Sequence, residues 1–261
     1  MTNFPKSLFV ASMIIGGVSM ANAQEKTKPE QTEFYTPVPP VVETKEVTTA
    51  PPSDAIILFD GKDLSKWVMT NDRTQPAAWT VAKNVFTVNK KAGNIETKQA
   101  FNNYQLHIEW QVPANIEGKG QGRGNSGLFL ASIGKGDDGY ELQILDSYKN
   151  DTYTNGQAAS IYKQLVPLAN PTRKPGEWQA YDVIWTAPTF NADQSVKTPA
   201  RVTVLFNGVL VQNNVELKGP TQYIGDPAYR KAHGPSPIKL QSHGDPSQPL
   251  SFRNIWIREL L

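Results

Sequence analysis

Residues 104–112 carry the pattern that most constrains how this chain folds. Apolar and polar side chains alternate there without a break, and the apolar set is Tyr104, Leu106, Ile108, Trp110 and Val112. Successive side chains of a strand point to opposite faces, so this segment predicts a strand with one face in the core. Such a face needs a second layer to pack against. The pattern therefore favours two packed antiparallel sheets.

Similar short strands are expected from residue 55 to the end of the sequence. Asn207-Gly208 between two alternating runs indicates a type I′ hairpin, and residues 79–88 predict another hairpin that turns near Lys83-Asn84. The terminal strands 56–59 and 252–258 are expected to pair, and only residues 226–232 offer a short helix. The remaining predicted strands are 126–131, 140–146, 179–185, 201–206, 209–215 and 238–243. We therefore expect one all-β domain over residues 55–261.

The first 54 residues have a different character. Residues 1–23 combine a positively charged start, an apolar stretch and a small-residue cleavage pattern at Ala21-Asn22-Ala23. This predicts a secretory signal peptide, with an uncleaved anchor as the alternative. Residues 24–54 are rich in Pro, Thr and Glu and poor in large apolar residues, which predicts a disordered linker. We expect an exported protein, periplasmic or extracellular, with no membrane span after cleavage.

Charge and missing residue types exclude several classes of function. Lys and Arg total 26 against 24 Asp and Glu, so the basic surface of a nucleic-acid-binding protein is not expected. The sequence has no Cys, which excludes disulfides, thiolate nucleophiles and cysteine metal sites. No dinucleotide, P-loop, zinc-protease or GxSxG motif is present, and no metal-ligand spacing occurs. No cofactor and no metal is expected.

Two predicted strands carry rows of polar side chains on the face opposite their apolar residues. Glu141 and Gln143 share one such face, and Lys239, Gln241 and His243 share another. If both rows lie on one concave sheet, Glu141 and His243 meet across a groove. The alternative is that both rows are simply solvated, and that interpretation is preferred for His107 and Glu109, which show the same parity.

Two loops favour the groove. Residues 118–127 are rich in glycine, which lets the backbone approach a ligand closely. Arg123 and Asn125 at the end of this loop can hydrogen-bond sugar hydroxyls, although an ordinary turn fits the spacing equally well. The second loop, His243-Gly244-Asp245-Pro246, places a histidine at the end of a strand beside a glycine.

Six segments in order along residues 55–261 resemble the family once called DUF1080 and now described as 3-keto-disaccharide hydrolase. They are Phe-Asp-Gly-Lys-Asp-Leu-Ser-Lys-Trp at 59–67, Gly-Asn-Ser-Gly-Leu-Phe at 124–129, Gly-Tyr-Glu-Leu-Gln-Ile-Leu-Asp at 139–146, Pro-Gly-Glu-Trp at 175–178, Leu-Gln-Ser-His-Gly at 240–244 and Phe-Arg-Asn-Ile-Trp-Ile at 252–257. The resemblance implies a concanavalin A-like jelly roll of two curved sheets. Ser242 stands where family members often carry Asp, but its predicted direction is away from His243.

The resemblance also implies the substrate, a glycoside already oxidised to a ketone at C3. The ketone acidifies the C2 proton, so a base can form an enolate and the aglycone at C1 can be eliminated before water adds back. Glu141 and His243 are the candidates for acid and base, in either order. The sugar hydroxyls or the enolate would be held by Arg123, Asn125, Gln143 and Gln241, with Asp146 and Tyr162 as weaker choices. Tyr162 and Trp178 are candidates for stacking on a sugar ring, although an aromatic residue in a sandwich belongs more often to the core.

Two other functions remain open at this stage. An ordinary glycosidase needs two carboxylates, and Asp146 is the candidate partner of Glu141 if its strand bends. A noncatalytic carbohydrate-binding module would use the same lectin-like fold without turnover. The resemblance further implies a functional partner, a sugar 3-dehydrogenase that makes the ketone.

Overall fold

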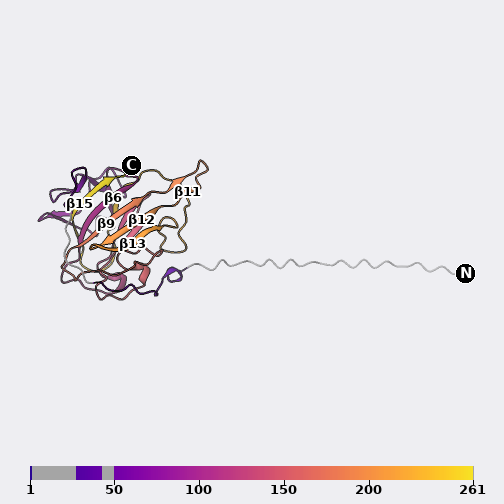
Figure 1. Ribbon diagram of the computed structural model, residues 1–261, viewed down its shortest axis with the longest axis horizontal. Coiled ribbons are helices and arrows are strands. Elements are labelled where there is room, and N and C mark those ends of the chain that lie inside the picture. The colour runs from indigo at the N-terminus through magenta and orange to yellow at the C-terminus, as the bar shows by residue number, and fades with distance from the viewer. Residues whose placement is uncertain (2–27, 43–49, 261) are drawn as a thin grey trace.

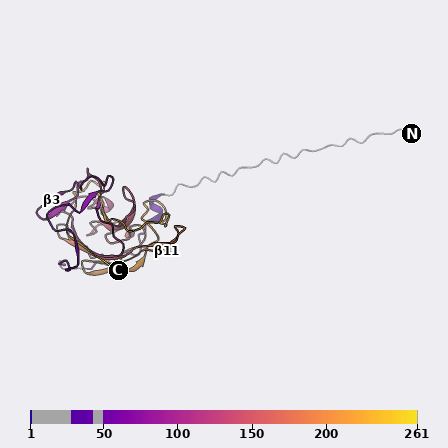
Figure 2. The same ribbon diagram turned by 90° about the horizontal axis from the view of Figure 1, so that it is seen from above.

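Two antiparallel sheets face each other and form the sandwich of jelly-roll type that the sequence predicts (Figure 1). The computed structural model describes residues 1, 28–42 and 50–260. Viewed from above, the ribbon curves around the interior of the domain (Figure 2). Helical structure within the described residues is limited to the 3-10 turns η1 (Pro29–Thr32), η2 (Gly120–Gly122) and η3 (Thr154–Gly156). None of the helices in this part of the chain has the length and apolar character needed to cross a bilayer.

The larger sheet has eight strands and contains both ends of the domain. Along the sheet the order is β13-β12-β9-β6-β15-β4-β3, with β1 paired to β15. The strands are β1 (Ile56–Phe59), β3 (Thr80–Ala82), β4 (Val85–Thr87), β6 (Tyr104–Gln111), β9 (Gln179–Thr186), β12 (Arg201–Phe206), β13 (Val209–Glu216) and β15 (Ser251–Glu259). The antiparallel pairing of β1 with β15 confirms that the terminal strands close the domain.

The smaller sheet has five strands in the order β2-β5-β14-β7-β8. Its strands are β2 (Trp67–Met69), β5 (Ile95–Thr97), β7 (Ser126–Ser132), β8 (Gly139–Ile144) and β14 (Lys239–Leu240). The late strand β14 is thus inserted between two strands that come much earlier in the chain. A separate two-stranded ribbon consists of β10 (Thr189–Phe190) and β11 (Val196–Thr198).

Local turn chemistry explains the hairpins. Asn207 and Gly208 both have positive φ, at 51° and 81°, as a type I′ turn between β12 and β13 requires. Lys83 and Asn84 adopt the same region between β3 and β4, so both predicted hairpins are confirmed. The short helix expected at residues 226–232 is wrong, because the segment is irregular. Tertiary contacts override the local preference there: the Tyr229 hydroxyl donates to the Leu217 carbonyl and accepts from the Ala200 amide.

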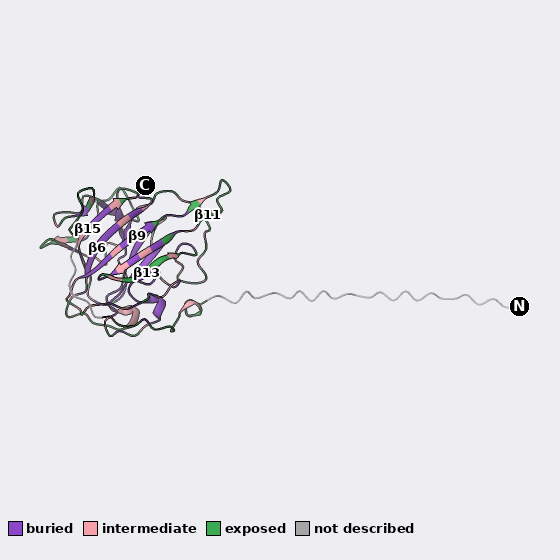
Figure 3. Ribbon diagram, viewed as in Figure 1, coloured by how far each residue is buried: buried purple, intermediate pink, exposed green. Residues whose placement is uncertain are grey.

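Large aromatic side chains fill the space between the sheets and connect them. Trp110, Tyr181 and Phe206 of the larger sheet are fully buried, and Figure 3 shows the buried central strands β6, β9 and β15. The Tyr181 hydroxyl donates to the Gln143 carbonyl on β8 at 2.8 Å. The Tyr104 hydroxyl donates to the Leu130 carbonyl on β7 at 2.6 Å. These bonds satisfy buried hydroxyls and hold the smaller sheet in register over the larger one.

Residues 28–42, which we call the N-terminal strap, differ from the disordered linker expected over residues 24–54. The Asn155 side chain accepts from the Phe34 amide and donates to the Thr32 carbonyl, both at 2.9 Å. The Val42 amide donates to the Asn170 carbonyl at 3.1 Å. Backbone hydrogen bonds to the domain therefore order a segment that has little apolar surface to bury. The signal-peptide prediction falls on residues outside the described part of the chain and stays a prediction.

Candidate functional site

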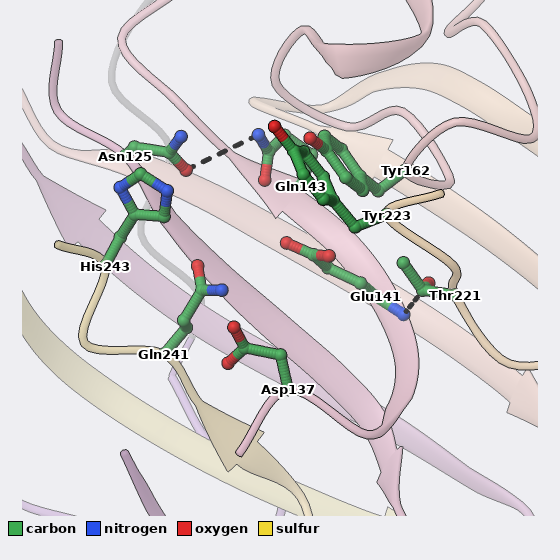
Figure 4. A pocket seen from close by; sticks show the side chains of 9 residues that line it. All are labelled: Asn125, Asp137, Glu141, Gln143, Tyr162, Thr221, Tyr223, Gln241 and His243. Atoms are coloured by element: carbon green, nitrogen blue, oxygen red, sulfur yellow. Dashed lines mark hydrogen bonds between the residues drawn. The ribbon is translucent and has the colours of Figure 1, made fainter. Parts of the chain in front are cut away.

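A pocket of about 190 Å³ lies on the face of the five-stranded sheet that points away from the core. Leu142 and Ile144 of β8 face the core, so the neighbouring side chains of Glu141 and Gln143 face the pocket. The pocket brings together six of the nine candidate residues, including Glu141 and His243 (Figure 4). Its lining is Asn125, Asp137, Glu141, Gln143, Tyr162, Thr221, Tyr223, Gln241 and His243.

Glu141 is the most deeply buried acid of the pocket, with 6 % of its surface exposed. Its backbone amide donates to the Thr221 hydroxyl at 3.0 Å, and its carbonyl accepts from the Tyr162 amide at 3.1 Å. Burial raises the pKa of Glu141 to about 8, and the negative charge of Asp137 adds to the rise. The carboxyl group is therefore largely protonated at neutral pH.

Gly127 provides the space that the Glu141 carboxyl group occupies. Gly127 lies on β7, one strand away, and a Cβ atom at this position would stand 2.6 Å from Glu141 Oε1. We assign the Gln143 amide in the orientation that satisfies its neighbours. Its nitrogen then donates to Glu141 Oε1 at 3.1 Å and to the Ser126 carbonyl at 2.9 Å. These contacts fix one oxygen of the acid and leave the other to carry the proton.

His243 lies across the pocket on the segment that follows β14. Its Nδ1 stands 3.1 Å from Asp245 Oδ2, and the Asp245 backbone amide donates toward the same nitrogen at 3.2 Å. Figure 4 shows the opposite ring nitrogen directed toward the side of the pocket that holds Glu141 and Gln143. When Nδ1 donates to the Asp245 carboxylate, Nε2 carries a free lone pair and can accept a proton.

Asp245 is a strong partner for this imidazole because it is ionised and firmly held. Burial alone would raise the pKa of Asp245, but hydrogen bonds from His243, Ser247 and Lys90 outweigh it and lower the pKa to about 2. Lys90 Nζ lies 3.0 Å from Asp245 Oδ2, and the Ser247 amide donates to Oδ1 at 2.9 Å. The sequence reasoning missed this role, although the spacing of two residues from His243 to Asp245 was a usable signal.

The loop between β7 and β8 brings Asp137 to the pocket, and a buried lysine fixes this loop. Lys239 Nζ donates to the carbonyls of Gly134, Gly136 and Asp138 at 3.1, 2.9 and 2.8 Å. The Asn94 side chain donates to Asp137 Oδ1 at 2.8 Å and accepts from the Ser242 amide at 2.8 Å. Asn94 thus links the loop of Asp137 to the segment of His243. Neither Asp137 nor Asn94 was a sequence candidate, because a turn gives no parity from which to predict direction.

Gln241 and Asn125 complete the polar wall. The Gln241 backbone amide donates to the Gly127 carbonyl at 2.9 Å, which places the Gln241 side chain in the pocket. Within the described residues Gln241 Oε1 is buried without a hydrogen-bond partner, so it can accept from a ligand hydroxyl. Asn125 is held by the Gln121 carbonyl at 2.9 Å.

Three sequence candidates lie outside the pocket lining. Arg123 Nε stands 2.8 Å from Asp146 Oδ2, and Arg123 also donates to the Tyr148 carbonyl at 2.5 Å. This ion pair occupies both side chains, with the Asp146 carboxylate buried and the Arg123 guanidinium partly exposed. Trp178 stacks under the guanidinium of Arg253, 4.2 Å from its ring centroid, on the larger sheet. Because its carboxylate is paired with Arg123 and lies outside the pocket lining, Asp146 is not placed to act beside Glu141 on one glycosidic bond.

The outer face of the larger sheet holds a second polar cluster, and here the expectation of solvated side chains is wrong. His107 and Glu109 are both buried. His107 Nδ1 lies 2.7 Å from Asp182 Oδ1 and Nε2 lies 3.3 Å from Glu109 Oε1, and Glu109 also pairs with Arg253 at 2.5 Å. Burial lowers the pKa of His107, but hydrogen bonds to the two carboxylates outweigh it and raise the pKa to about 9. Balanced opposite charges explain why polar side chains are buried here.

Comparisons with known proteins identify the family and support the fold. A family model described as 3-keto-alpha-glucoside-1,2-lyase-like domain matches residues 54–258. A crystal structure of a candidate glycosyl hydrolase from Parabacteroides distasonis is 58 % identical, with 88 % of this chain and 96 % of that chain covered and a TM-score of 0.77. Another candidate glycosyl hydrolase from the same organism shares 19 % identity over 79 % of this chain and 94 % of that chain, with a TM-score of 0.58, and is alike in fold.

No curated protein matches the chain. Among the described residues, no group of three or more His, Asp or Glu side chains is arranged to hold a metal ion. The family model covers nearly the whole sandwich, and the resemblance seen in six sequence segments is confirmed. The chain belongs to the family of 3-keto-alpha-glucoside-1,2-lyase-like domains.

Proposed function

We propose that this protein cleaves 3-keto-glycosides by elimination and rehydration, with His243 as the base and Glu141 as the acid. One observation carries the proposal: an acid that is neutral at pH 7 and an imidazole held by an ionised aspartate line the same small pocket. A protonated carboxyl group can give a proton and an imidazole with a free lone pair can take one, which are the two roles that acid–base catalysis needs. The coarser conclusion, a glycoside-cleaving enzyme, is supported by the similarity to candidate glycosyl hydrolases.

The first half of the reaction breaks the glycosidic bond. His243 Nε2 removes the proton from C2, and the electron pair forms an enolate with the C3 ketone. The enolate then expels the leaving group from C1 as the C1–C2 double bond forms. Glu141 gives its proton to the departing oxygen, so the leaving group departs as an alcohol rather than an alkoxide. Asp245 keeps the imidazole oriented and stabilises its positive charge, as aspartate does in other His–Asp pairs.

The second half restores both catalytic groups. The Glu141 carboxylate takes a proton from water, whose oxygen adds to C1 of the unsaturated ketone. His243 returns its proton to C2, so the net reaction consumes one water and yields the 3-keto sugar and the free alcohol. Gln241 Oε1 and Asn125 are polar groups of the lining suited to holding hydroxyls during both steps.

The test compares 3-keto-trehalose and 3-keto-sucrose with the unoxidised disaccharides. Elimination requires the ketone, so free sugar should appear only from the oxidised pair. A substrate with deuterium at C2 should react several-fold more slowly, because the C2–H bond breaks. Glu141→Gln and His243→Ala should each abolish most of the activity, while Ser242→Ala, one residue from His243 and outside the pocket lining, should not.

Other outcomes would identify the two alternative functions. Cleavage of the unoxidised sugars, with no isotope effect at C2, would indicate an ordinary glycosidase, for which Asp137 is the second carboxylate in the pocket. Sugar binding without any turnover would indicate a carbohydrate-binding module. Either result would refute the elimination mechanism.

We further propose that the protein is exported and that a sugar 3-dehydrogenase supplies its substrate. The leader pattern of residues 1–23 supports export. The substrate's C3 ketone must come from oxidation of a secondary alcohol, which is the reaction class of such a dehydrogenase. Fractionation of cells and assay of the periplasm test the location.

A further inference from the structure

Tyr223 is an aromatic residue of the pocket for which the proposed mechanism has no use. It lies in the irregular segment after β13, and 63 % of its surface is exposed. It nevertheless lines the pocket beside Tyr162 and Glu141. An exposed aromatic ring at the edge of a polar pocket is a suitable surface for the apolar face of a ligand.

The position of Tyr223 is fixed by a buried lysine. Lys163, with 4 % of its surface exposed, donates from Nζ to the Tyr223 carbonyl at 3.0 Å and lies 4.6 Å from the centroid of the Tyr223 ring. The same ammonium donates to the Pro29 carbonyl at 2.8 Å and stands 3.8 Å from Glu33 Oε1. The N-terminal strap and Lys163 together therefore hold an exposed ring in one place, which lowers the entropy lost when a ligand packs against it.

Tyr223 lies on the acid side of the pocket. Figure 4 shows the rings of Tyr162 and Tyr223 next to each other near Gln143 and Glu141, with His243 on the other side. The Tyr162 hydroxyl is already bonded to the Tyr153 hydroxyl at 2.7 Å. A leaving group whose oxygen receives the proton of Glu141 therefore extends along the side where Tyr223 stands.

We propose that Tyr223 forms the subsite for the leaving group and that this subsite selects ring-shaped leaving groups, such as a second pyranose, over small alkyl groups. The carbon-bound hydrogens of a pyranose form an apolar face that packs on an aromatic ring. The selection rests on the proposed function only through the assignment of Glu141 as the acid.

The test compares two 3-keto-α-glucosides that differ only in the leaving group, 3-keto-trehalose and methyl 3-keto-α-glucoside. Tyr223→Ala should lower kcat/KM about tenfold for the disaccharide, mainly through KM, and leave the methyl glycoside within about twofold, because packing on one ring is worth up to about 1.4 kcal/mol, which is a factor of ten. Tyr223→Phe should retain the wild-type preference. Ile224→Ala is the matched control, since Ile224 is the next residue, is 47 % exposed and is not in the lining.

Two results would overturn the subsite: an unchanged kcat/KM for the disaccharide in Tyr223→Ala, or an equal loss with both substrates. If no 3-keto-glycoside is turned over at all, the proposed function fails and binding decides the subsite instead. Calorimetry would then compare trehalose with methyl α-glucoside. A preference for trehalose that disappears in Tyr223→Ala would support the subsite, and the same affinity in both variants, or no binding, would refute it.

Discussion

Gly127→Ala is the sharpest test of how the sheet positions the candidate acid. The φ of Gly127 lies outside the region that favours glycine, so alanine can adopt the same backbone and only the space changes. The added Cβ would stand 2.6 Å from Glu141 Oε1 and 3.0 Å from Phe129 Cε2. Ordinary contact begins at 3.4 Å, so the carboxyl group must move by about 0.8 Å, the difference between 3.4 and 2.6 Å.

A displacement near 1 Å in a catalytic group can lower the rate about 100-fold, and we expect a loss of that size in kcat. The fold should lose only about 1 kcal/mol, the low end for an extra methyl group in a packed site, or about 3 °C in Tm. Release of sugar from 3-keto-trehalose measures the first effect, and thermal unfolding measures the second.

Gly244→Ala is the matched control for this experiment. Gly244 is next to His243, has no positive φ, and apart from its two neighbours in the chain no heavy atom lies within 4 Å of the Cβ it would gain. Wild-type activity is expected for this variant. If Gly127→Ala keeps its activity within about threefold of the wild type, the explanation of Gly127 as the space for the acid is wrong.

Three further predictions concern charge. Asp245→Asn should lower kcat at least about 100-fold with little change in KM, because the imidazole loses its orienting carboxylate, and unchanged steady-state kinetics would contradict the His–Asp pair. Because the pKa of Glu141 is raised, the contribution of Glu141 to the free energy of unfolding is complete below about pH 4.5 and is lost as the pH rises through about 8. Urea unfolding should therefore give a lower free energy of unfolding at pH 9 than at pH 5, and this difference should be smaller in Glu141→Gln. The contribution of His107 to the free energy of unfolding is complete below about pH 6.5 and is lost as the pH rises through about 9. His107→Gln should therefore lower the free energy of unfolding by about 2 kcal/mol at pH 6 and by less at pH 10. An equal loss at both pH values would refute a charged His107.

Strand parity predicted the face on which Glu141, Gln143 and Gln241 lie. Successive side chains of a strand point to opposite faces, so once the apolar residues face the core the polar ones must face the other side. The hairpin at Asn207-Gly208 was predictable for a similar reason, since few residues accept positive φ. Both the strand face and the hairpin turn are determined by residues that are close together in the sequence.

Contacts between distant segments were not predictable in this way. Nothing near Arg123 in the sequence shows that Asp146 neutralises it, and nothing near Tyr223 indicates the buried ammonium of Lys163. His107 was expected in solvent because its parity is polar, whereas burial depends on the carboxylates of Asp182 and Glu109 that face it. Ion pairs, or hydrogen bonds from a buried charge, between segments distant in the sequence decided each of these positions.

The insertion of β14 between β5 and β7 affects how the protein must fold. The pocket depends on a segment near residue 240 that joins strands from residues 95–97 and 126–132. Such high contact order slows folding, because a long loop must close before the pairing is gained. Until that segment has been synthesised, β5 and β7 present unpaired edges to other chains. Assembly of the catalytic pocket is therefore expected to follow synthesis of almost the whole sandwich, and nascent chains that end earlier should depend on chaperones.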